Sequence, residues 1–446
     1  MALYPPNPPV AGVPLDRILR DIEEHLIPLM THWQHPGWFA YFSSSASVAA
    51  ILGDWMASVF GNNAMLHKTA PDVVEQELCV TGWMRNLLGL HPAFEGQIMP
   101  NASTSTLTAL ILARDAFAGI DSRDNGLAGR NNKPLTIYTS EHGHSSIDKA
   151  AFQAGFGLSN VRHISSDNNC RMLSAALDEE IRRDRDAGYL PVAIVSTAGT
   201  TATGSIDPLD EISDIAQRWG IYHHVDGAFG GMVGIDPTRR SLLRGIDRAD
   251  SVVVNPHKWL TGLDCSTFFC KHPRLLRKVF SVVPSYLQHD DDADDPMNWG
   301  PSLSRRDRSM KLWFVLRHYG TEALIELVRD SIDLATQFAE RVVTSNDFEL
   351  VVPQSISVVV FRPKLSIVDD TIKDRINRRL IDRVIARGVA SLSGTVLRGQ
   401  FVIRLAVGNV RTTLKDIDLV WNALQEELPA ARADIVRSSR AVAVLS

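Results

Sequence analysis

The chain has 446 residues, 45% of them hydrophobic, which is enough for a large buried core and more than one structural domain. Its formal net charge of −5 provides no basic field that would attract nucleic acid. The apolar runs are shorter than the roughly 20 residues of a membrane helix, and no basic-then-apolar signal pattern opens the sequence. We therefore expect a cytoplasmic protein with neither nucleic-acid nor membrane partners.

Helical and strand patterns alternate along most of the chain. The first ten residues are rich in proline and predict an extended arm, and residues 15–30 predict an amphipathic helix. From about residue 70, expected helices cover 101–117, 145–154 and 207–219, and expected strands cover 135–138, 192–196 and two runs ending at Asp226 and Asn255. This alternation implies parallel strands with helices on both faces of one sheet.

The pattern changes after about Tyr319. The expected elements there are a long helix, strands at 357–361 and 401–405, a helix at 374–387 and a closing helix. They indicate a smaller α+β domain. We therefore expect an N-terminal arm and helix over residues 1–47, a large cofactor-binding domain over 48–318 and a small C-terminal domain over 319–446.

Two residues at strand ends carry the strongest chemical signal. Lys258 stands in Asn-Pro-His-Lys-Trp after one apolar run, and Asp226 stands in His-Val-Asp-Gly-Ala after another. A lysine amine can hold the aldehyde of pyridoxal phosphate as a Schiff base, and a carboxylate can keep its pyridine nitrogen protonated. A surface lysine and a capping aspartate are the plain alternatives, but the two motifs together favour a pyridoxal phosphate site.

Further polar groups accompany this pair. The segment 101–106 opens a helix with a cluster of hydroxyls, and a helix N-terminus suits a phosphate, although ordinary capping explains the same residues. His142 and His144 are two residues apart with no third ligand nearby, so we expect no metal site. The four cysteines form no C-x-x-C pair and predict neither a disulfide framework nor a zinc site.

These motifs resemble the group II pyridoxal-phosphate decarboxylases, and most closely the aromatic-L-amino-acid decarboxylases. The resemblance runs from about Trp33 to the C-terminal helix. It implies an α/β protein of the PLP-dependent transferase fold type I, with a mostly parallel seven-stranded sheet in the large domain and a smaller α+β C-terminal domain. It also implies pyridoxal 5′-phosphate as the cofactor and a homodimer with shared active sites.

The resemblance assigns roles to individual residues. The implied catalytic residues are Lys258, Tyr286, His144 and Asp226. The implied cofactor-binding residues are Ala102, Ser103, His144, Thr201, Asp226, Ser251, Asn255, His257 and Lys258. His144 would stack on the cofactor ring. Tyr286 would return a proton to the substrate α-carbon, and relatives with phenylalanine there release aldehydes, so this tyrosine favours simple decarboxylation over aldehyde release. A tyrosine that only packs is the plain alternative.

The implied substrate-binding residues are Trp33, Tyr41, Phe42, Asn63, Met65 and Arg404. The aromatic members suit an aromatic amino acid, because ring-lined walls gain from stacking and apolar burial. Asn63 and Met65 belong to a loop, 61–67, that is aromatic in the animal enzymes, and here it would also tolerate a polar or acidic side chain. Arg404 could pair with the substrate carboxylate or, equally, with a structural acid.

The expected reaction is decarboxylation of an L-amino acid to its amine and carbon dioxide, with tryptophan, tyrosine, DOPA or phenylalanine as the preferred substrate. One alternative is a decarboxylase of an acidic or aliphatic amino acid such as glutamate, aspartate or valine. Others are an oxygen-consuming aromatic aldehyde synthase, an aminotransferase or desulfurase of the same fold type, and a catalytically silent cofactor-binding protein.

Overall fold

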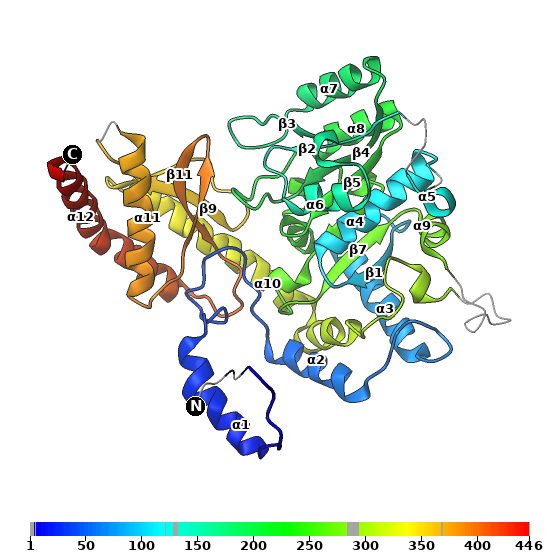
Figure 1. The fold of residues 1–446 in the computed structure, drawn as a ribbon, viewed down its shortest axis with the longest axis horizontal. Coiled ribbons are helices and arrows are strands. Elements are labelled where there is room, and N and C mark those ends of the chain that lie inside the picture. The colour runs from blue at the N-terminus through cyan, green and yellow to red at the C-terminus, as the bar shows by residue number, and fades with distance from the viewer. Residues whose placement is uncertain are drawn as a thin grey trace.

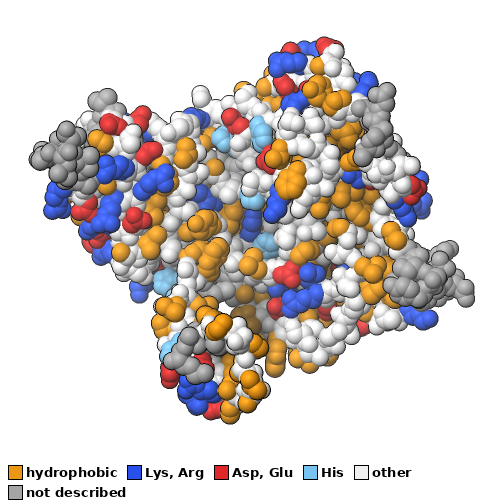
Figure 2. Space-filling model, in the orientation of Figure 1, with side chains coloured by type: hydrophobic (Ala, Val, Ile, Leu, Met, Phe, Trp, Pro, Cys, Tyr) orange, Lys and Arg blue, Asp and Glu red, His pale blue; other side chains and the backbone are white. Residues whose placement is uncertain are grey.

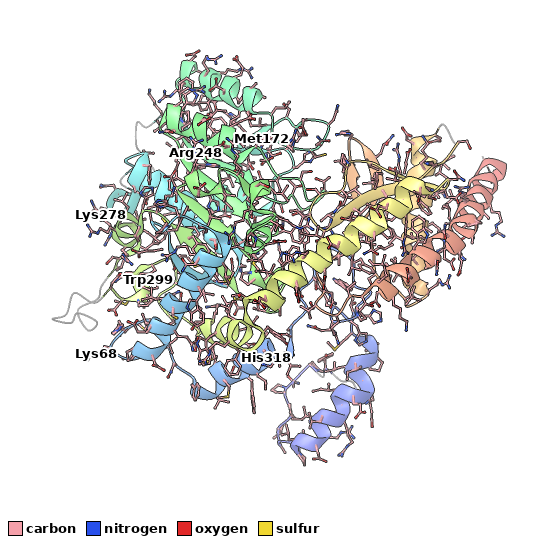
Figure 3. The ribbon with its side chains drawn as sticks, turned by 180° about the vertical axis from the view of Figure 1, so that it is seen from behind. Lys68, Met172, Arg248, Lys278, Trp299 and His318 are labelled. Carbon is pink, nitrogen blue, oxygen red and sulfur yellow. The ribbon has the colours of Figure 1, made fainter. Side chains whose placement is uncertain are left out.

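The structure is a computed structural model that describes residues 4, 6–120, 122–127, 133–282, 294–366 and 369–445. Figure 1 shows two parts connected by the long helix α10 (Ser309–Thr344), with α1 (Leu15–Asp21) projecting away from both. Seen from behind in Figure 3, α10 runs from the first part into the second, with His318 near its beginning. None of the helices in these ranges is long and apolar enough to cross a membrane.

The first part is built on a seven-stranded sheet. In spatial order its strands are β1 (Glu95–Met99), β7 (Ser266–Cys270), β6 (Ser251–Val254), β5 (Tyr222–Gly227), β4 (Leu190–Thr197), β2 (Leu135–Ser140) and β3 (Val161–Ile164). Five consecutive strands, from β6 to β3, are parallel, and β7 is antiparallel to both of its neighbours. The expected mostly parallel seven-stranded sheet is therefore confirmed.

Helices cover both faces of this sheet, which explains why β2, β5 and β6 are buried along their whole length. The helices α4 (Ala102–Leu112) and α6 (Ser146–Gln153) pack on one face, against alternate residues such as Ile137. The helices α7 (Ser174–Asp186) and α8 (Leu209–Trp219) pack on the other, against Tyr138 and Ile194. The remaining α-helices of this part are α2 (Val48–Phe60), α3 (Pro71–Leu88), α5 (Ser122–Asn125) and α9 (Pro273–Phe280).

The second part contains an antiparallel four-stranded sheet. Its strands, in spatial order, are β10 (Ser393–Leu397), β11 (Gln400–Ala406), β9 (Val358–Pro363) and β8 (Phe348–Leu350). The second half of α10, α11 (Asp370–Ala386) and α12 (Leu414–Leu445) enclose a separate apolar core with it. Gly320 interrupts α10 with φ 73°, close to the expected boundary at 318/319, and this break supports the proposed division of the chain into domains.

The expected N-terminal helix needs correction. Only Leu15–Asp21 is α-helical, and the chain continues as a π-helical turn, Ile22–Leu26, and a 3-10 turn, Ile27–Leu29. None of these three helical segments buries a side chain, although leucine and isoleucine recur at helical spacing. Tertiary packing within the chain therefore does not use the apolar stripe that predicted this helix.

A buried ion pair joins α3 to the segment before α10, next to β1. Glu77 Oε1 accepts hydrogen bonds from the Ile98 N–H at 2.8 Å and from Arg305 Nη2 at 2.6 Å. The side chains of Glu77 and Arg305 are 3% and 8% exposed, so neither charge can be satisfied by solvent if its partner is removed. The backbone of Arg305 also bonds to Asn63 Oδ1 and to the Ala64 N–H.

Replacing Glu77 with alanine should lower the free energy of unfolding by about 3–5 kcal/mol, because it leaves the Arg305 charge buried and unpaired. Urea denaturation followed by circular dichroism measures the change. The matched control is Glu179→Ala, which removes an exposed i,i+3 pair with Arg182 and should cost about 0.2–1 kcal/mol. Equal losses in the two variants would contradict this account.

Candidate active site

Asp226 and Lys258 lie at the same edge of the large sheet. β5 and β6 are parallel and pair Asp226 with Val253, so both strands deliver their following residues to one edge. Beyond β6, Asn255 precedes a 3-10 turn, Pro256–Lys258, that ends at the lysine. Figure 2 shows histidine and Lys/Arg side chains gathered in the hollow between the two parts of the chain. The structure thus brings the predicted pair together.

The Lys258 amine is buried among charged neighbours. Burial lowers its pKa to about 8, the Asp226 carboxylate opposes this shift, and Arg404 adds to it. A lysine with this pKa carries a substantial fraction of neutral amine near pH 8, and only the neutral amine can attack an aldehyde. Asp226 itself is 5% exposed and accepts a hydrogen bond from the Ala228 N–H at 3.0 Å.

His144 belongs to the same site. Burial lowers its pKa, and the Asp226 and Lys258 charges act on it in opposite directions. Its Nδ1 accepts a hydrogen bond from the Ser146 N–H at 3.1 Å, so the proton of the neutral ring resides on Nε2. His142 instead bonds through Nε2 to Ser166 Oγ at 3.0 Å.

The N-terminus of α4 lies beside the ends of β5 and β6. Ala102 packs against Ala228 and Val253 in one small apolar cluster. Asn101 caps the helix by accepting a hydrogen bond from the Thr104 N–H at 3.0 Å, and the side chain of Ser103 is exposed. A capped helix N-terminus with free N–H groups at this edge is a suitable cradle for a phosphate.

The other predicted cofactor-binding residues differ in their distance from the site edge and in their burial. Asn255 and His257 are buried at the site edge, where Asn255 Oδ1 accepts a hydrogen bond from Ser266 Oγ at 2.6 Å. Thr201 is exposed in the turn after β4. Ser251 lies at the opposite end of β6, and its hydroxyl bonds to His224 Nδ1 at 2.8 Å. Three strand residues separate Ser251 from this edge, and its role in cofactor binding stays a prediction that these contacts do not support.

An aromatic wall borders the lysine. Phe42 stacks on Phe229 with ring centroids 3.8 Å apart. Trp33 stacks on Trp38 at 4.4 Å and on Tyr41 at 6.0 Å. The three predicted aromatic residues thus belong to two stacks, Phe42 with Phe229 and Trp33 with Tyr41 and Trp38, and the sequence interpretation missed Phe229 and Trp38. Phe229 stands three residues after Asp226, and this nearness in sequence was the one signal for it.

Arg404 is buried without a carboxylate partner among the described residues. Its Nη1 donates to the Tyr41 carbonyl oxygen, while Nε and Nη2 have no hydrogen-bond partner. Burial alone lowers its pKa to about 9. Two partners were expected for this arginine, the substrate carboxylate or an acidic side chain of the protein. The structure gives no support to the acidic side chain, and an unpaired buried guanidinium is suited to a ligand carboxylate.

Two predicted substrate residues lie elsewhere in the single chain. Asn63 Oδ1 accepts a hydrogen bond from the Arg305 N–H at 3.0 Å, and its amide contacts Met65 Sδ at 3.2 Å. The Met65 carbonyl accepts from the Met297 N–H at 3.0 Å. These contacts fix the loop on the segment 294–306 and do not join it to Lys258. Tyr286 lies outside the described residues.

The residues at this edge fit pyridoxal phosphate. They provide a buried amine of lowered pKa, a buried carboxylate, a neutral imidazole and a helix N-terminus, which match the aldehyde, the pyridine nitrogen, the ring and the phosphate of that cofactor. Within the described ranges, no group of three or more side chains is arranged to hold a metal ion. The fold and the site thus define a class of enzyme that binds pyridoxal phosphate through a lysine.

Comparison with known proteins gives the family. The model of the pyridoxal-dependent decarboxylase conserved domain matches residues 1–364. Tyrosine decarboxylase 3 of Petroselinum crispum is 34% identical, covering 100% of this chain and 88% of the relative. Phenylacetaldehyde synthase of Arabidopsis thaliana is 35% identical, covering 95% of this chain and 88% of the relative.

A solved structure agrees with these relatives. Oryza sativa TDC with PLP and tryptamine superposes with a TM-score of 0.91 and 31% identity, covering 95% of this chain and 90% of that chain. The chain belongs to the pyridoxal-phosphate-dependent decarboxylases, which are carboxy-lyases. The expected family, fold, enzyme class and cofactor are therefore confirmed.

Buried histidines at and beneath the site should make stability depend on pH. Burial lowers the pKa of His224 and of His257 to about 4, and that of His223 to about 3, whereas an unfolded chain titrates near 6.5. As pH falls from about 6.5 towards 4, the unfolded chain binds protons that the native chain does not, so stability falls by roughly 1–3 kcal/mol per histidine.

Urea midpoints at about pH 7.5 and about pH 5 measure this dependence. His224→Asn keeps a polar atom near Ser251 and removes one titrating group, so its stability should change less between the two pH values. Identical pH dependence in the variant and the wild type would contradict the assignment of His224.

Proposed function

We propose that the enzyme decarboxylates an aromatic L-amino acid, releasing the amine and carbon dioxide. The observation that carries the proposal is the buried Arg404 guanidinium, which has no carboxylate partner among the described residues and lies with Lys258 against the ring of Phe42. Tyr41, whose carbonyl oxygen accepts a hydrogen bond from Arg404, stacks on Trp33. A site that offers a cation next to aromatic faces suits a carboxylate attached to an aromatic side chain. The names of tyrosine and tryptophan decarboxylases among the relatives support the same substrate class.

In this proposal each residue has one task. Pyridoxal phosphate, when bound, supplies the ring system that accepts the electron pair released as carbon dioxide leaves. Lys258 would hold the cofactor aldehyde, Asp226 would keep the pyridine nitrogen protonated, and His144, with its proton on Nε2, would contact the cofactor ring. The first turn of α4, with Asn255 and His257, would hold the phosphate. Arg404 orients the substrate carboxylate.

Tyr286 is proposed to return a proton to the substrate α-carbon. This role separates the proposed reaction from oxygen-consuming aldehyde formation. Two of the relatives are named phenylacetaldehyde synthase. Tyrosine rather than phenylalanine at position 286 favours the amine product. A cytoplasmic location stays a prediction.

We further propose that the chain works as a homodimer. The face of α2 exposes a group of large apolar side chains, which are Val48, Ile51, Leu52, Trp55, Val59 and Phe60. A groove of about 520 Å³ between the start of α2 and α10 is also mainly apolar. Exposed apolar surface on this scale supports a covering partner, and a second copy would bring its 61–67 loop to a shared site.

Analytical ultracentrifugation should therefore give twice the chain mass of 49.2 kDa. Trp55→Glu should shift the protein to monomers, because it places a charge in the apolar face, and should lower activity with it. Leu158→Glu changes a side chain of similar exposure in the 3-10 turn Leu158–Asn160, which precedes β3, and serves as the control. A wild-type monomer with full activity would contradict the dimer proposal.

The substrate proposal is tested by amine and carbon dioxide release from the holoenzyme. The panel is tryptophan, tyrosine, DOPA, phenylalanine, glutamate, aspartate, valine and lysine, with a parallel peroxide assay. We expect an aromatic preference, amine as the product and no peroxide. Lys258→Ala should abolish turnover and the visible absorbance of the cofactor. Preference for an acidic or aliphatic substrate would reject the aromatic assignment, and peroxide with aldehyde would reject simple decarboxylation.

A further inference from the structure

The ring of Phe42 lies against both cations of the site. Lys258 Nζ is 4.7 Å from the ring centroid, and Arg404 Cζ is 4.5 Å from it. The ring is held by a column of aromatic residues, since Phe42 stacks on Phe229 at 3.8 Å and Phe229 stacks on Trp259 at 4.9 Å. The Trp259 indole N–H donates to the Phe229 carbonyl at 2.9 Å and fixes the column at its base.

This arrangement offsets the repulsion between two neighbouring buried cations. Two buried cations lie close enough for Arg404 to lower the pKa of Lys258, and Arg404 has two N–H groups without partners. The negative face of an aromatic ring attracts cations, and this attraction is strongest where water is excluded. The Phe42 ring therefore offers both cations a partner that needs no carboxylate and leaves the Arg404 donors free.

We propose that Phe42 is a positioning residue that holds the Lys258 amine and the Arg404 guanidinium side by side through its ring. The inference rests on the proposed function of this site and gives Phe42 a task beyond lining the substrate pocket. The two cations come from the turn after β6 and from β11, and Phe42 comes from the segment before α2. One ring thus contacts a cation from each of the two parts of the chain, next to the Lys258 amine that reacts with the cofactor.

The test uses the holoenzyme and three variants. The visible absorbance of the bound cofactor, which follows the protonation of its link to Lys258, is titrated with pH. Phe42→Leu keeps an apolar side chain without a ring and should lower the titration midpoint by about 0.4–1.5 pH units, because the cationic form loses the ring. Phe42→Trp and Phe42→Tyr keep a ring and should titrate above the Phe42→Leu midpoint, close to wild type.

Steady-state kinetics provide a second readout. If the ring also positions Arg404, Phe42→Leu should raise KM for the amino acid roughly 2- to 30-fold with a smaller change in kcat, and Phe42→Trp should restore most of KM. Should Phe42→Leu not retain the cofactor, Phe42→Met replaces it as the ringless variant.

Two results would overturn the inference. One is an unshifted midpoint in the folded, cofactor-loaded ringless variant, and the other is an equal shift in the Leu and Trp variants, which would indicate packing alone. Both leave the site assignment intact as long as the absorbance depends on Lys258. Cofactor absorbance that survives in Lys258→Ala would instead reject the proposed function itself.

Discussion

A buried lysine amine, held between the charges of Asp226 and Arg404, is the constraint on which the site depends. Burying an ammonium group costs free energy. Burial therefore favours the neutral amine and lowers the pKa of Lys258 to about 8. The same burial makes the amine available for chemistry with an aldehyde. A lysine on a solvated loop would remain charged and would have no fixed direction. The sheet edge supplies both the burial and the direction.

The topology of the sheet explains how distant residues meet there. Parallel pairing of β5 with β6 delivers Asp226 and the Pro256–Lys258 turn to one edge, and the N-terminus of α4 reaches the same edge through Ala102. The second part contributes Arg404 from β11, and the segment before α2 contributes Phe42. The site therefore combines a rigid phosphate- and ring-binding edge with a cation delivered by a separate core. That division suits an enzyme that must fix its cofactor and exchange its substrate.

The sequence predicted the parts of this arrangement that follow from local pattern. A continuous apolar, β-branched run identified β4, and shorter apolar runs located β2, β5 and β6, because helices cover both faces of these strands. Strands β1 and β3 were missed, because Glu95 and Gln97 in one and Arg162 and His163 in the other interrupt the apolar pattern. Lys258, Asp226 and His144 could be predicted because their motifs resemble those of a known family.

Other features depend on contacts that a sequence does not encode locally. Among the described residues no carboxylate pairs with Arg404, and Phe229 stacks on Phe42; both features arise where separate segments meet. The resemblance assigned Ser251 to the cofactor, yet its place at the start of β6 turns it towards His224. The contact between Asn63 and Arg305 joins residues more than two hundred positions apart, which no periodicity reveals.

The most direct test of the central claim is to locate the cofactor covalently. The holoenzyme is reduced with borohydride, digested and mapped by mass spectrometry. The account predicts a pyridoxyl group on Lys258 alone, and predicts that Asp226→Asn keeps this attachment while losing most of its turnover. A pyridoxyl group on another lysine, or full turnover in Asp226→Asn, would contradict the account.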